Sequence, residues 1–456
     1  MLTLAAAGTE QLWDELLPLE VRQLPQDLAA LDELLGDPAL LAPIAARWEQ
    51  SARERGRPSL AIETYVRLMV IKHRCGWGYE TLVREVSDSL HLRRFCRIAL
   101  DTRVPDESTV RKLTRRLGAD VVAEITRALI AKATREKRFR ARAVRIDSTV
   151  IEADIQYPTD ADLASHGVRR LAREGRKLAA KIGAKRTAVR DRSRAIGHTL
   201  RVISRTIRRR TGEAKAEVLK LTEQTGKLLE RSVRETRRLA TQARAKARGR
   251  GAKVKQRAAA KLEELADRCS KVAEQIRRRV AGEKITDRLV SLADPDARPI
   301  RKGKLGKPTE FGYVTQLAEV TPNTKRGARG FILPPASAPG NPTEDTLLPT
   351  TVAELDRLGL SPREVALDGG FNTGPTTESL AAIAPERVFI SGRRQPGSRH
   401  TQRRLQRYRT GAEGRISHVK RSYGLRRSRL KGDQGQRIWT GWATLAYNLD
   451  TYTRLT

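Results

Sequence analysis

Apolar residues recur every three or four positions between residues 60 and 118, the spacing that gathers them on one face of a helix. They are Ile62, Val66, Met69, Val70, Leu82, Val83, Val86, Leu90, Leu92 and Phe95. The turn-forming sequence "GWG" at 76–78 interrupts this pattern. The spacing therefore predicts a compact helical unit with a turn near 76–78.

The segment "VPDESTVRKLTRRLG" predicts one further helix, capped by Asp106 and ended by Gly118. Its buried stripe would contain Val110, Leu113 and Leu117. Four basic residues would then face outward: Arg111, Lys112, Arg115 and Arg116. Such a face either lies on DNA phosphates or serves as a solubilising surface, and the pattern alone leaves both readings open.

Residues 165–288 are rich in Ala, Arg, Lys, Glu and Leu, a helix-forming composition. Alternating steps of three and four residues indicate the seams of packed, coiled-coil-like helices. One seam has Ile196, Leu200, Ile203 and Ile207, and the other has Ala258, Leu262, Leu265, Cys269, Val272 and Ile276. Residues 201–280 hold 25 Lys and Arg against nine Asp and Glu. We expect a basic helical arm that contacts either DNA or another protomer, with these candidate DNA contacts: Arg208, Arg209, Arg210, Arg277, Arg278 and Arg279.

Short apolar runs bounded by Gly, Pro and Asn follow the arm and predict strands. They are "FGYVTQLAEV" (311–320), "GFILPPASA" (330–338), "REVALDGG" (363–370) and "ERVFISG" (386–392). With "ARAVRIDSTVI" (141–151) and helices near 345–359 and 374–384, they predict an α/β domain of about five strands, interrupted after its first strand. Ile438, Trp442, Leu445 and Leu449 share one face of a last helix.

The net charge of the chain indicates what kind of partner it binds. The chain has 456 residues and a formal net charge of +37, with an isoelectric point near 11.0. Two or three domains are expected at this length, and nucleic acid is the expected partner of so basic a chain. No stretch resembles a membrane anchor or a basic leader, so we expect a cytoplasmic protein. Cys75, Cys96 and Cys269 show no zinc-binding spacing.

Three acids could carry metal chemistry. Asp147 and Asp368 each follow an apolar run, and Gly369 and Gly370 would permit close approach after Asp368. Glu413 opens a helix on which Lys420 falls about two turns later, roughly on the same face. Taken singly, each acid is more readily a surface ion pair than a metal ligand. Together, their oxygens could hold two divalent ions that activate a hydroxyl and stabilise a leaving oxygen.

The order Asp147, Asp368, Glu413 resembles the acidic triad of bacterial insertion-sequence DDE transposases, in particular the ISNCY group. The resemblance runs over most of the chain, and the blocks that carry it are "GRPSLAIETYVRLMVIKHRCGWGYETLVREVSDSLHLRRFCRI", "VPDESTVRKLTRRL", "RIDSTVIEADIQYPTD", "GKPTEFGYVTQLAEV", "ALDGGFNTGPT" and "RTGAEGRISHVKRSYGLRRSRLKG" with "AYNL". It implies an RNase H-like core whose first strand carries the first Asp and whose late helix carries the Glu.

The resemblance also implies site roles. Asp147 and Asp368 would bridge or flank Mg²⁺ ions, for which Mn²⁺ substitutes, and Glu413 would complete the second ion's shell. Arg409 and Lys420 would contact the scissile or adjacent phosphate, and Arg426 and Arg427 are further candidate DNA contacts. The family's Tyr position holds Gln406 here, with Tyr408 displaced by two residues.

The expected layout has a helical DNA-binding domain at 1–135, catalytic-core pieces at 136–164 and 289–456, and the helical insertion at 165–288. The expected function is a transposase that binds its terminal repeats on double-stranded DNA, cleaves there and joins the 3′ ends to target DNA as a homodimer or higher oligomer. Two alternatives stay open: a non-catalytic, architectural DNA-binding protein, and an RNase H-like nuclease without strand transfer.

Other ionisable residues rank lower as site candidates. His418 lies near Glu413 but is more simply a helix-surface histidine, since two-metal chemistry needs no histidine. None of the rival acids directly ends an apolar run, and Asp345 resembles a helix cap. These acids are Asp154, Asp160, Asp294, Asp296 and Asp345.

Overall fold

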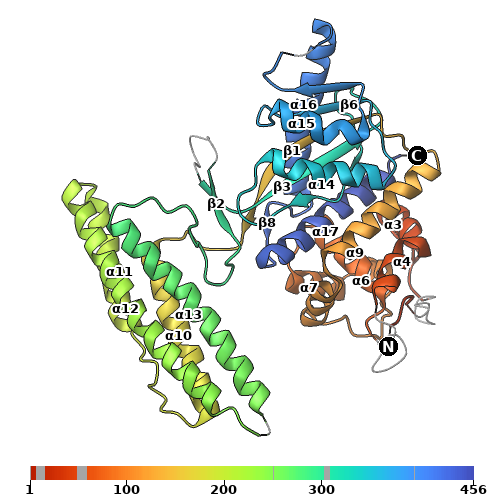
Figure 1. Cartoon of the computed structure of the whole chain (residues 1–456). Coiled ribbons are helices and arrows are strands. Elements are labelled where there is room, and N and C mark those ends of the chain that lie inside the picture. The colour runs from red at the N-terminus through yellow and green to blue at the C-terminus, as the bar shows by residue number, and fades with distance from the viewer. Residues whose placement is uncertain are drawn as a thin grey trace. The chain divides into compact units, whose positions relative to one another are not determined.

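The computed structural model describes residues 2–6, 16–48, 59–249, 251–301, 309–394 and 396–455. The chain divides into two compact units (Figure 1). The first combines Met1–Asp154 with Tyr313–Thr456, and the second is Ile155–Gly312. The second unit is therefore an insertion between two segments of the first.

A mixed sheet forms the centre of the first unit. Its strand order is β2-β3-β1-β6-β7, and the strands are β1 (Ala143–Ala153), β2 (Arg298–Arg301), β3 (Thr309–Thr321), β4 (Phe331–Ile332), β5 (Ala336–Ser337), β6 (Glu364–Leu367), β7 (Arg387–Ile390) and β8 (Arg427–Ser428). Strands β1, β6 and β7 are parallel, whereas β4 and β5 run antiparallel to β3. Strand β2 pairs with residues 309–312 of β3, which belong to the second unit. The predicted mixed α/β class is confirmed.

Most helices of the first unit share one apolar core with the sheet. The described helices of this unit are α2 (Leu19–Arg22), α3 (Gln26–Leu35), α4 (Pro38–Arg47), α6 (Ile62–Arg74), α7 (Tyr79–Asp88), α8 (Leu90–Phe95), α9 (Glu107–Arg135), α14 (Glu344–Arg357), α15 (Thr373–Leu380), α16 (Arg399–Ser422) and α17 (Gly432–Tyr452). Ile438, Trp442, Leu445 and Leu449 of α17 are all buried, as their spacing predicts. Since α17 packs on both α6 and α9, the N-terminal helices and the sheet form one body.

Gly118 was expected to end its helix, but the helix continues beyond it. Helix α9 continues to Arg135, with a kink at Gly118, whose φ of 76° lies in the left-handed region that glycine tolerates. The chain resumes the helix because Val121, Val122 and Ile125 continue the apolar spacing and are buried. Asp106 occupies the N-cap position, but its carboxylate accepts a hydrogen bond from Arg103 rather than from the helix backbone.

A buried ion pair ties the sheet to the C-terminal helices. Arg145 of β1 donates to Glu319 Oε2 of β3 from Nε (2.8 Å) and Nη2 (2.6 Å), and both side chains are at most 4% exposed. The second carboxylate oxygen of Glu319 accepts from Arg415 Nε of α16 (2.8 Å) and from the Tyr447 hydroxyl of α17 (3.1 Å). One carboxylate thus satisfies donors from three elements.

Glu319→Leu is expected to lower the free energy of unfolding by about 3–5 kcal/mol, because it leaves the Arg145 cation buried without its partner. Urea unfolding measures this loss. Glu378→Gln, at an exposed position of α15, is the control and should change stability by less than about 0.5 kcal/mol. Equal stability of the two variants would contradict the role of Glu319.

The described part of the second unit contains four α-helices with their own apolar core: α10 (Asp160–Ile182), α11 (Ser193–Thr206), α12 (Gly212–Ala245) and α13 (Ala252–Val280). The predicted seam from Leu262 to Ile276 is buried there. Gly167 allows close packing, since a Cβ at this position would lie 2.8 Å from Leu229 and 3.0 Å from Cys269 Sγ. The prediction fails at Ile207, which is 60% exposed where α11 passes into a short 3-10 turn (Ile207–Arg209).

Candidate active site

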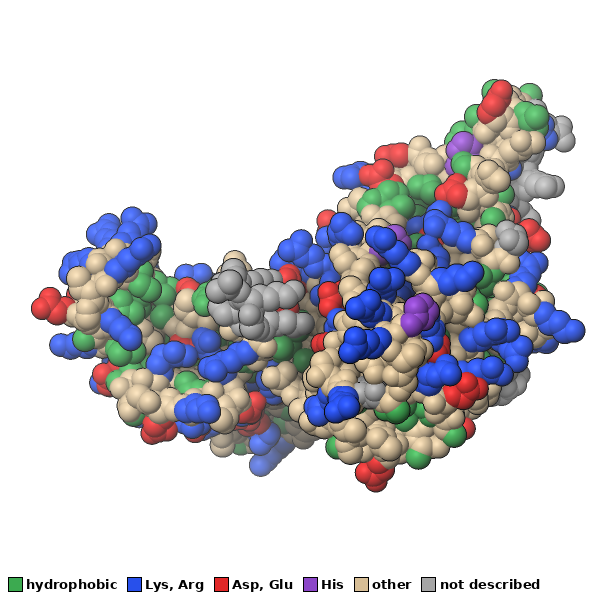
Figure 2. All heavy atoms as spheres, turned by 90° about the horizontal axis from the view of Figure 1, so that it is seen from above, with side chains coloured by type: hydrophobic (Ala, Val, Ile, Leu, Met, Phe, Trp, Pro, Cys, Tyr) green, Lys and Arg blue, Asp and Glu red, His purple; other side chains and the backbone are tan. Residues whose placement is uncertain are grey.

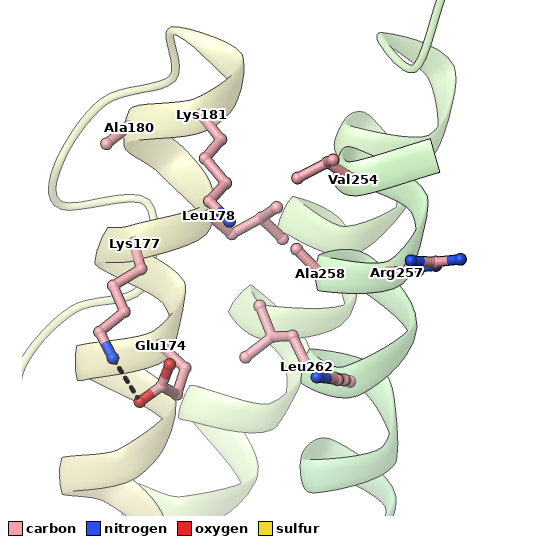
Figure 3. A pocket seen from close by; sticks show the side chains of 10 residues that line it. Glu174, Lys177, Leu178, Ala180, Lys181, Val254, Arg257, Ala258 and Leu262 are labelled. Atoms are coloured by element: carbon pink, nitrogen blue, oxygen red, sulfur yellow. Dashed lines mark hydrogen bonds and ion pairs between the residues drawn. The ribbon is translucent and has the colours of Figure 1, made fainter. Parts of the chain in front are cut away.

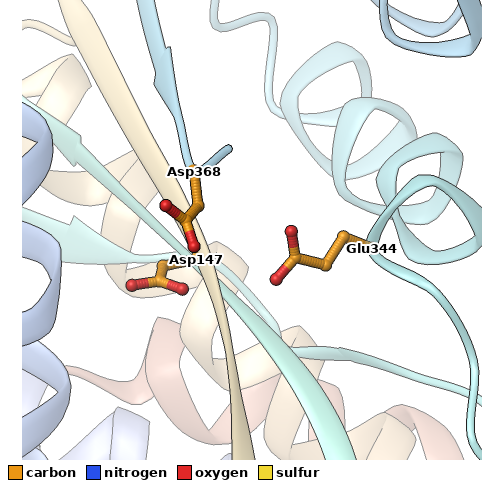
Figure 4. Close-up of side chains that lie close together, drawn as sticks. All are labelled: Asp147, Glu344 and Asp368. Atoms are coloured by element: carbon orange, nitrogen blue, oxygen red, sulfur yellow. The ribbon is translucent and has the colours of Figure 1, made fainter. Parts of the chain in front are cut away.

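Two aspartates lie side by side where β1 and β6 stop pairing. The parallel register places Ile146 opposite Leu367, so the next residues of the two strands are Asp147 and Asp368. Figure 4 shows their side chains close together on neighbouring strands. The sequence suggested that Asp147 lies at or near the end of its strand, but the structure places it inside β1. Strand β1 continues to Ala153 because its last residues pair with β8.

A third carboxylate joins them. Glu344 is the first residue of α14, and one oxygen from each of Asp147, Glu344 and Asp368 lies within 4.8 Å of the other two. In Figure 4 Glu344 reaches toward the aspartates from the helix side. Hard oxygen ligands at this spacing are the donor set that Mg²⁺ and Mn²⁺ prefer. Glu344 does not stand out in the sequence, because an acid in the first turn of a helix is common without any ligand.

The segment after Asp368 is held close to this group. A Cβ on Gly370 would collide with the Glu344 carboxylate, so this glycine provides the close approach expected of it. The sequence suggested that Asp345 caps its own helix, but the N-cap residue of α14 is Thr343. Its carboxylate accepts hydrogen bonds from the backbone N (3.0 Å) and Nδ2 (2.6 Å) of Asn372, and it thereby fixes the start of α15.

Burial is the main electrostatic influence on Asp147. The side chain is largely enclosed, and burial raises its pKa to about 6, with smaller upward contributions from the Asp368 and Glu413 carboxylates. The Arg409 guanidinium opposes this rise. Charged Asp147 is therefore disfavoured in the isolated chain, and a divalent cation beside it would favour the charged form.

Arg409 connects Asp368 to Glu413. It is 8% exposed and donates from Nη2 to Asp368 Oδ1 (2.5 Å) and from Nη1 to Glu413 Oε1 (2.9 Å). Glu413 lies one turn further along α16, inside this helix and not at its start as predicted, and its side chain is 61% exposed. Arg409 thus links Glu413 to Asp368. The group of three carboxylates, however, contains Glu344 and not the expected Glu413. The role of Glu413 as a metal ligand stays a prediction.

Other predicted residues of α16 face the sheet. Lys420 donates from Nζ to the carbonyl of Val150 on β1 (2.8 Å). Gln406 accepts a hydrogen bond from the Ser391 hydroxyl (3.2 Å), whereas the displaced Tyr408 is buried with its hydroxyl 2.6 Å from that of Thr321. His418 is half-buried, with its ring 5.6 Å from the Tyr423 ring, and burial and nearby arginines lower its pKa.

The predicted DNA contacts differ in whether an acidic side chain already pairs with them. Several already have acidic partners: Arg111 with Glu107, Arg209 with Glu217, Arg277 with Glu230, Arg278 with Glu283, Arg279 with Asp160, and Arg427 with Glu152. Arg116 stacks on the Trp48 ring at 4.0 Å. The remaining predicted contacts are exposed and have no ion pair with any residue in the described ranges: Lys112, Arg115, Arg208, Arg210 and Arg426. These five can meet phosphates without losing a partner.

Lysine and arginine side chains are spread over the face shown in Figure 2, with acidic side chains scattered among them. Within the second unit, a depression of about 740 Å³ between α10 and α13 has an apolar floor that includes Leu178 and Leu262 (Figure 3). Lys177 at its edge is paired with Glu174 at 3.2 Å. The depression therefore mixes apolar and partly neutralised basic groups and resembles no catalytic site.

No helix among the described residues has the length and apolar character needed to cross a lipid bilayer.

No curated protein and no solved structure matches the chain. Residues 19–116 match the family model of a transposase domain (DUF772). This stretch runs from α2 into α9 and includes the basic face at residues 111–116. The N-terminal helices are therefore similar to a transposase domain, and this match supports a transposase of the insertion-sequence type.

Proposed function

We propose that this chain is a divalent-metal-dependent DNA transposase that cleaves at the ends of its element and joins the 3′ ends to target DNA. The observation that carries this proposal is the juxtaposition of Asp147, Glu344 and Asp368 in a chain with a transposase domain. Binding DNA requires no such group of acids, whereas phosphoryl transfer uses carboxylate-held metal ions.

The donor set fits Mg²⁺, with Mn²⁺ as the expected substitute. Asp147, Glu344 and Asp368 would hold the metal, and Glu413 is a further carboxylate close by. When bound, divalent metal would activate the attacking hydroxyl and neutralise charge on the leaving oxygen. Water and a DNA 3′ hydroxyl can serve as nucleophile at the same site, which is why one site supports both cleavage and joining.

Residues of the chain position the reacting groups. Arg409 holds the carboxylates of Asp368 and Glu413 in a fixed relation, since its fork donates to both. Its charge, together with that of Lys420, would stabilise the phosphate as negative charge redistributes in the transition state. We propose both as phosphate contacts.

Arg409→Lys is expected to lower the cleavage rate at saturating DNA by at least about tenfold, because a single ammonium cannot bridge two carboxylates as the guanidinium does. The affinity for DNA should change little, because the charge is retained. Single-turnover kinetics separate the two effects. Arg421→Lys, at an exposed position of the same helix, is the control. A variant with the wild-type rate would contradict the positioning role.

Cleavage and joining of labelled DNA that carries the element's ends, with Mg²⁺ and with chelator, tests the proposal. The proposal predicts metal-dependent cuts at the ends and joined products. Bound but uncut DNA would support an architectural protein, and cuts without joining would support a nuclease. Size measurements of the complex on paired ends test the proposed dimer or higher oligomer.

A further inference from the structure

A basic groove lies on the first unit, formed by α16 and the turn between β3 and β4. It has a volume of about 970 Å³. Its ionisable lining residues are all basic: Lys325, Arg326, His400, Arg403, Arg404 and Arg407. The two other described residues that line it are threonines, so the described lining contains no acid and no Phe, Tyr or Trp side chain.

The groove is separate from the carboxylate group. His400, Arg403 and Arg407 follow one another at steps of three and four, so they share one face of α16. At about 100° per residue, Arg409 and Glu413 lie on a face centred about 130° away. One helix therefore presents the groove on one side and the residues that reach Asp368 on another.

Arg404 fixes the wall of the groove. It donates to both oxygens of Glu364 on β6, at 2.5 and 2.8 Å, and to the hydroxyl of Thr324. These hydrogen bonds lower the pKa of Glu364. Because Thr324 is held against α16, the next residues, Lys325 and Arg326, are held at the groove as well.

The charge of the groove is not neutralised locally. Glu364 already pairs with Arg404 and Arg387. Lys325, Arg326, Arg403 and Arg407 are exposed, and none forms an ion pair with a residue in the described parts of the chain. Four cations in one concave surface attract a polyanion, and the arginines present forks that match phosphate oxygens.

We propose that this groove binds the sugar-phosphate backbone of duplex DNA without regard to base sequence. Duplex DNA carries one charge per about 1.7 Å of its axis, which suits a row of cations. Among the described lining residues the one ring is the His400 imidazole, with no Phe, Tyr or Trp beside it, which argues against the stacking of successive single-stranded bases. The inference rests on the proposed function only for the nature of the substrate, and it adds a DNA contact on a different face of α16 from the residues that reach Asp368.

Arg403→Gln with Arg407→Gln tests the groove in the full chain. The dissociation constant for a labelled duplex should rise roughly tenfold, and the slope of log affinity against log salt should fall by about 1.8. Two duplexes of unrelated sequence should be affected equally. Arg357→Gln with Arg363→Gln is the control for charge, since both arginines are exposed and already have acidic partners. Thermal unfolding of both double variants verifies that they fold.

An unchanged salt slope, or equal weakening in the control, would overturn the inference. So would a loss confined to one duplex, or polyglutamate that competes as well as unlabelled duplex. The binding assay needs no catalysis. Weakened binding by the groove variant in a chain that never cuts DNA would support the groove and defeat the proposed function, whereas normal binding with normal cleavage would do the reverse.

Discussion

Asp147→Asn is expected to reduce cleavage and joining by on the order of a thousandfold or more while DNA binding remains. The amide keeps the shape of the side chain but removes the charge that would face the metal. Cleavage of end-bearing DNA and a separate DNA-binding titration measure the two effects. Asp356→Asn, at an exposed position of α14, is the matched control. Cleavage at the wild-type rate by Asp147→Asn would contradict the assignment.

The same substitution should stabilise the metal-free protein at neutral pH. Burial raises the pKa of Asp147 from 3.8 to about 6, so the folded state binds this proton more tightly than the unfolded state. Stability from Asp147 is therefore full below pH 3.8 and is lost as the pH rises through about 6. The shift corresponds to at most about 3 kcal/mol. Unfolding without metal should show a gain of about 1–3 kcal/mol at pH 7.5 that vanishes near pH 4.

Glu344→Gln is expected to weaken metal binding and to raise the Mg²⁺ concentration needed for half-maximal cleavage by at least about tenfold. The reason is the loss of one of three carboxylates that lie within 4.8 Å of one another. A Mg²⁺ titration of the cleavage rate measures the change, again with Asp356→Asn as the control. An unchanged Mg²⁺ requirement would remove Glu344 from the site.

Glu413→Gln should be measured beside Glu344→Gln. Glu413 contacts Arg409, whereas Glu344 lies with the aspartates. If Glu344 is the third ligand, its substitution should change the Mg²⁺ requirement more than substitution of Glu413. A larger effect of Glu413→Gln would favour the triad expected from the resemblance.

Sequence reasoning found the aspartates because each follows an apolar run that forms a strand. It could not show that β1 and β6 are neighbours, since pairing between strands more than two hundred residues apart leaves no local pattern. Glu344 could not be identified for a related reason. An acid at the start of a helix is common, and only the tertiary structure places its side chain beside Asp147. The position of Arg409 between Asp368 and Glu413 also depends on packing.

The helices show the same division between local and tertiary information. Periodicity predicts one buried face of α17, whereas nearly every residue from Gly435 to Tyr452 is buried because the helix packs on α6, α9 and β4. Gly118 only kinks its helix and does not end it, because the apolar spacing beyond it continues the helix. Arg145 would be read from sequence as an exposed cation, and its burial becomes understandable only with Glu319 beside it.

The most direct test of the central claim, that Asp147, Glu344 and Asp368 hold the metal for transposition, is strand joining. A pre-cut, labelled 3′ end is incubated with target DNA across a Mn²⁺ titration, with wild type and with Asp147→Asn. We predict saturable joining by the wild type and none by the variant, with equal DNA binding. Joining by Asp147→Asn at the wild-type rate and Mn²⁺ requirement would contradict the account.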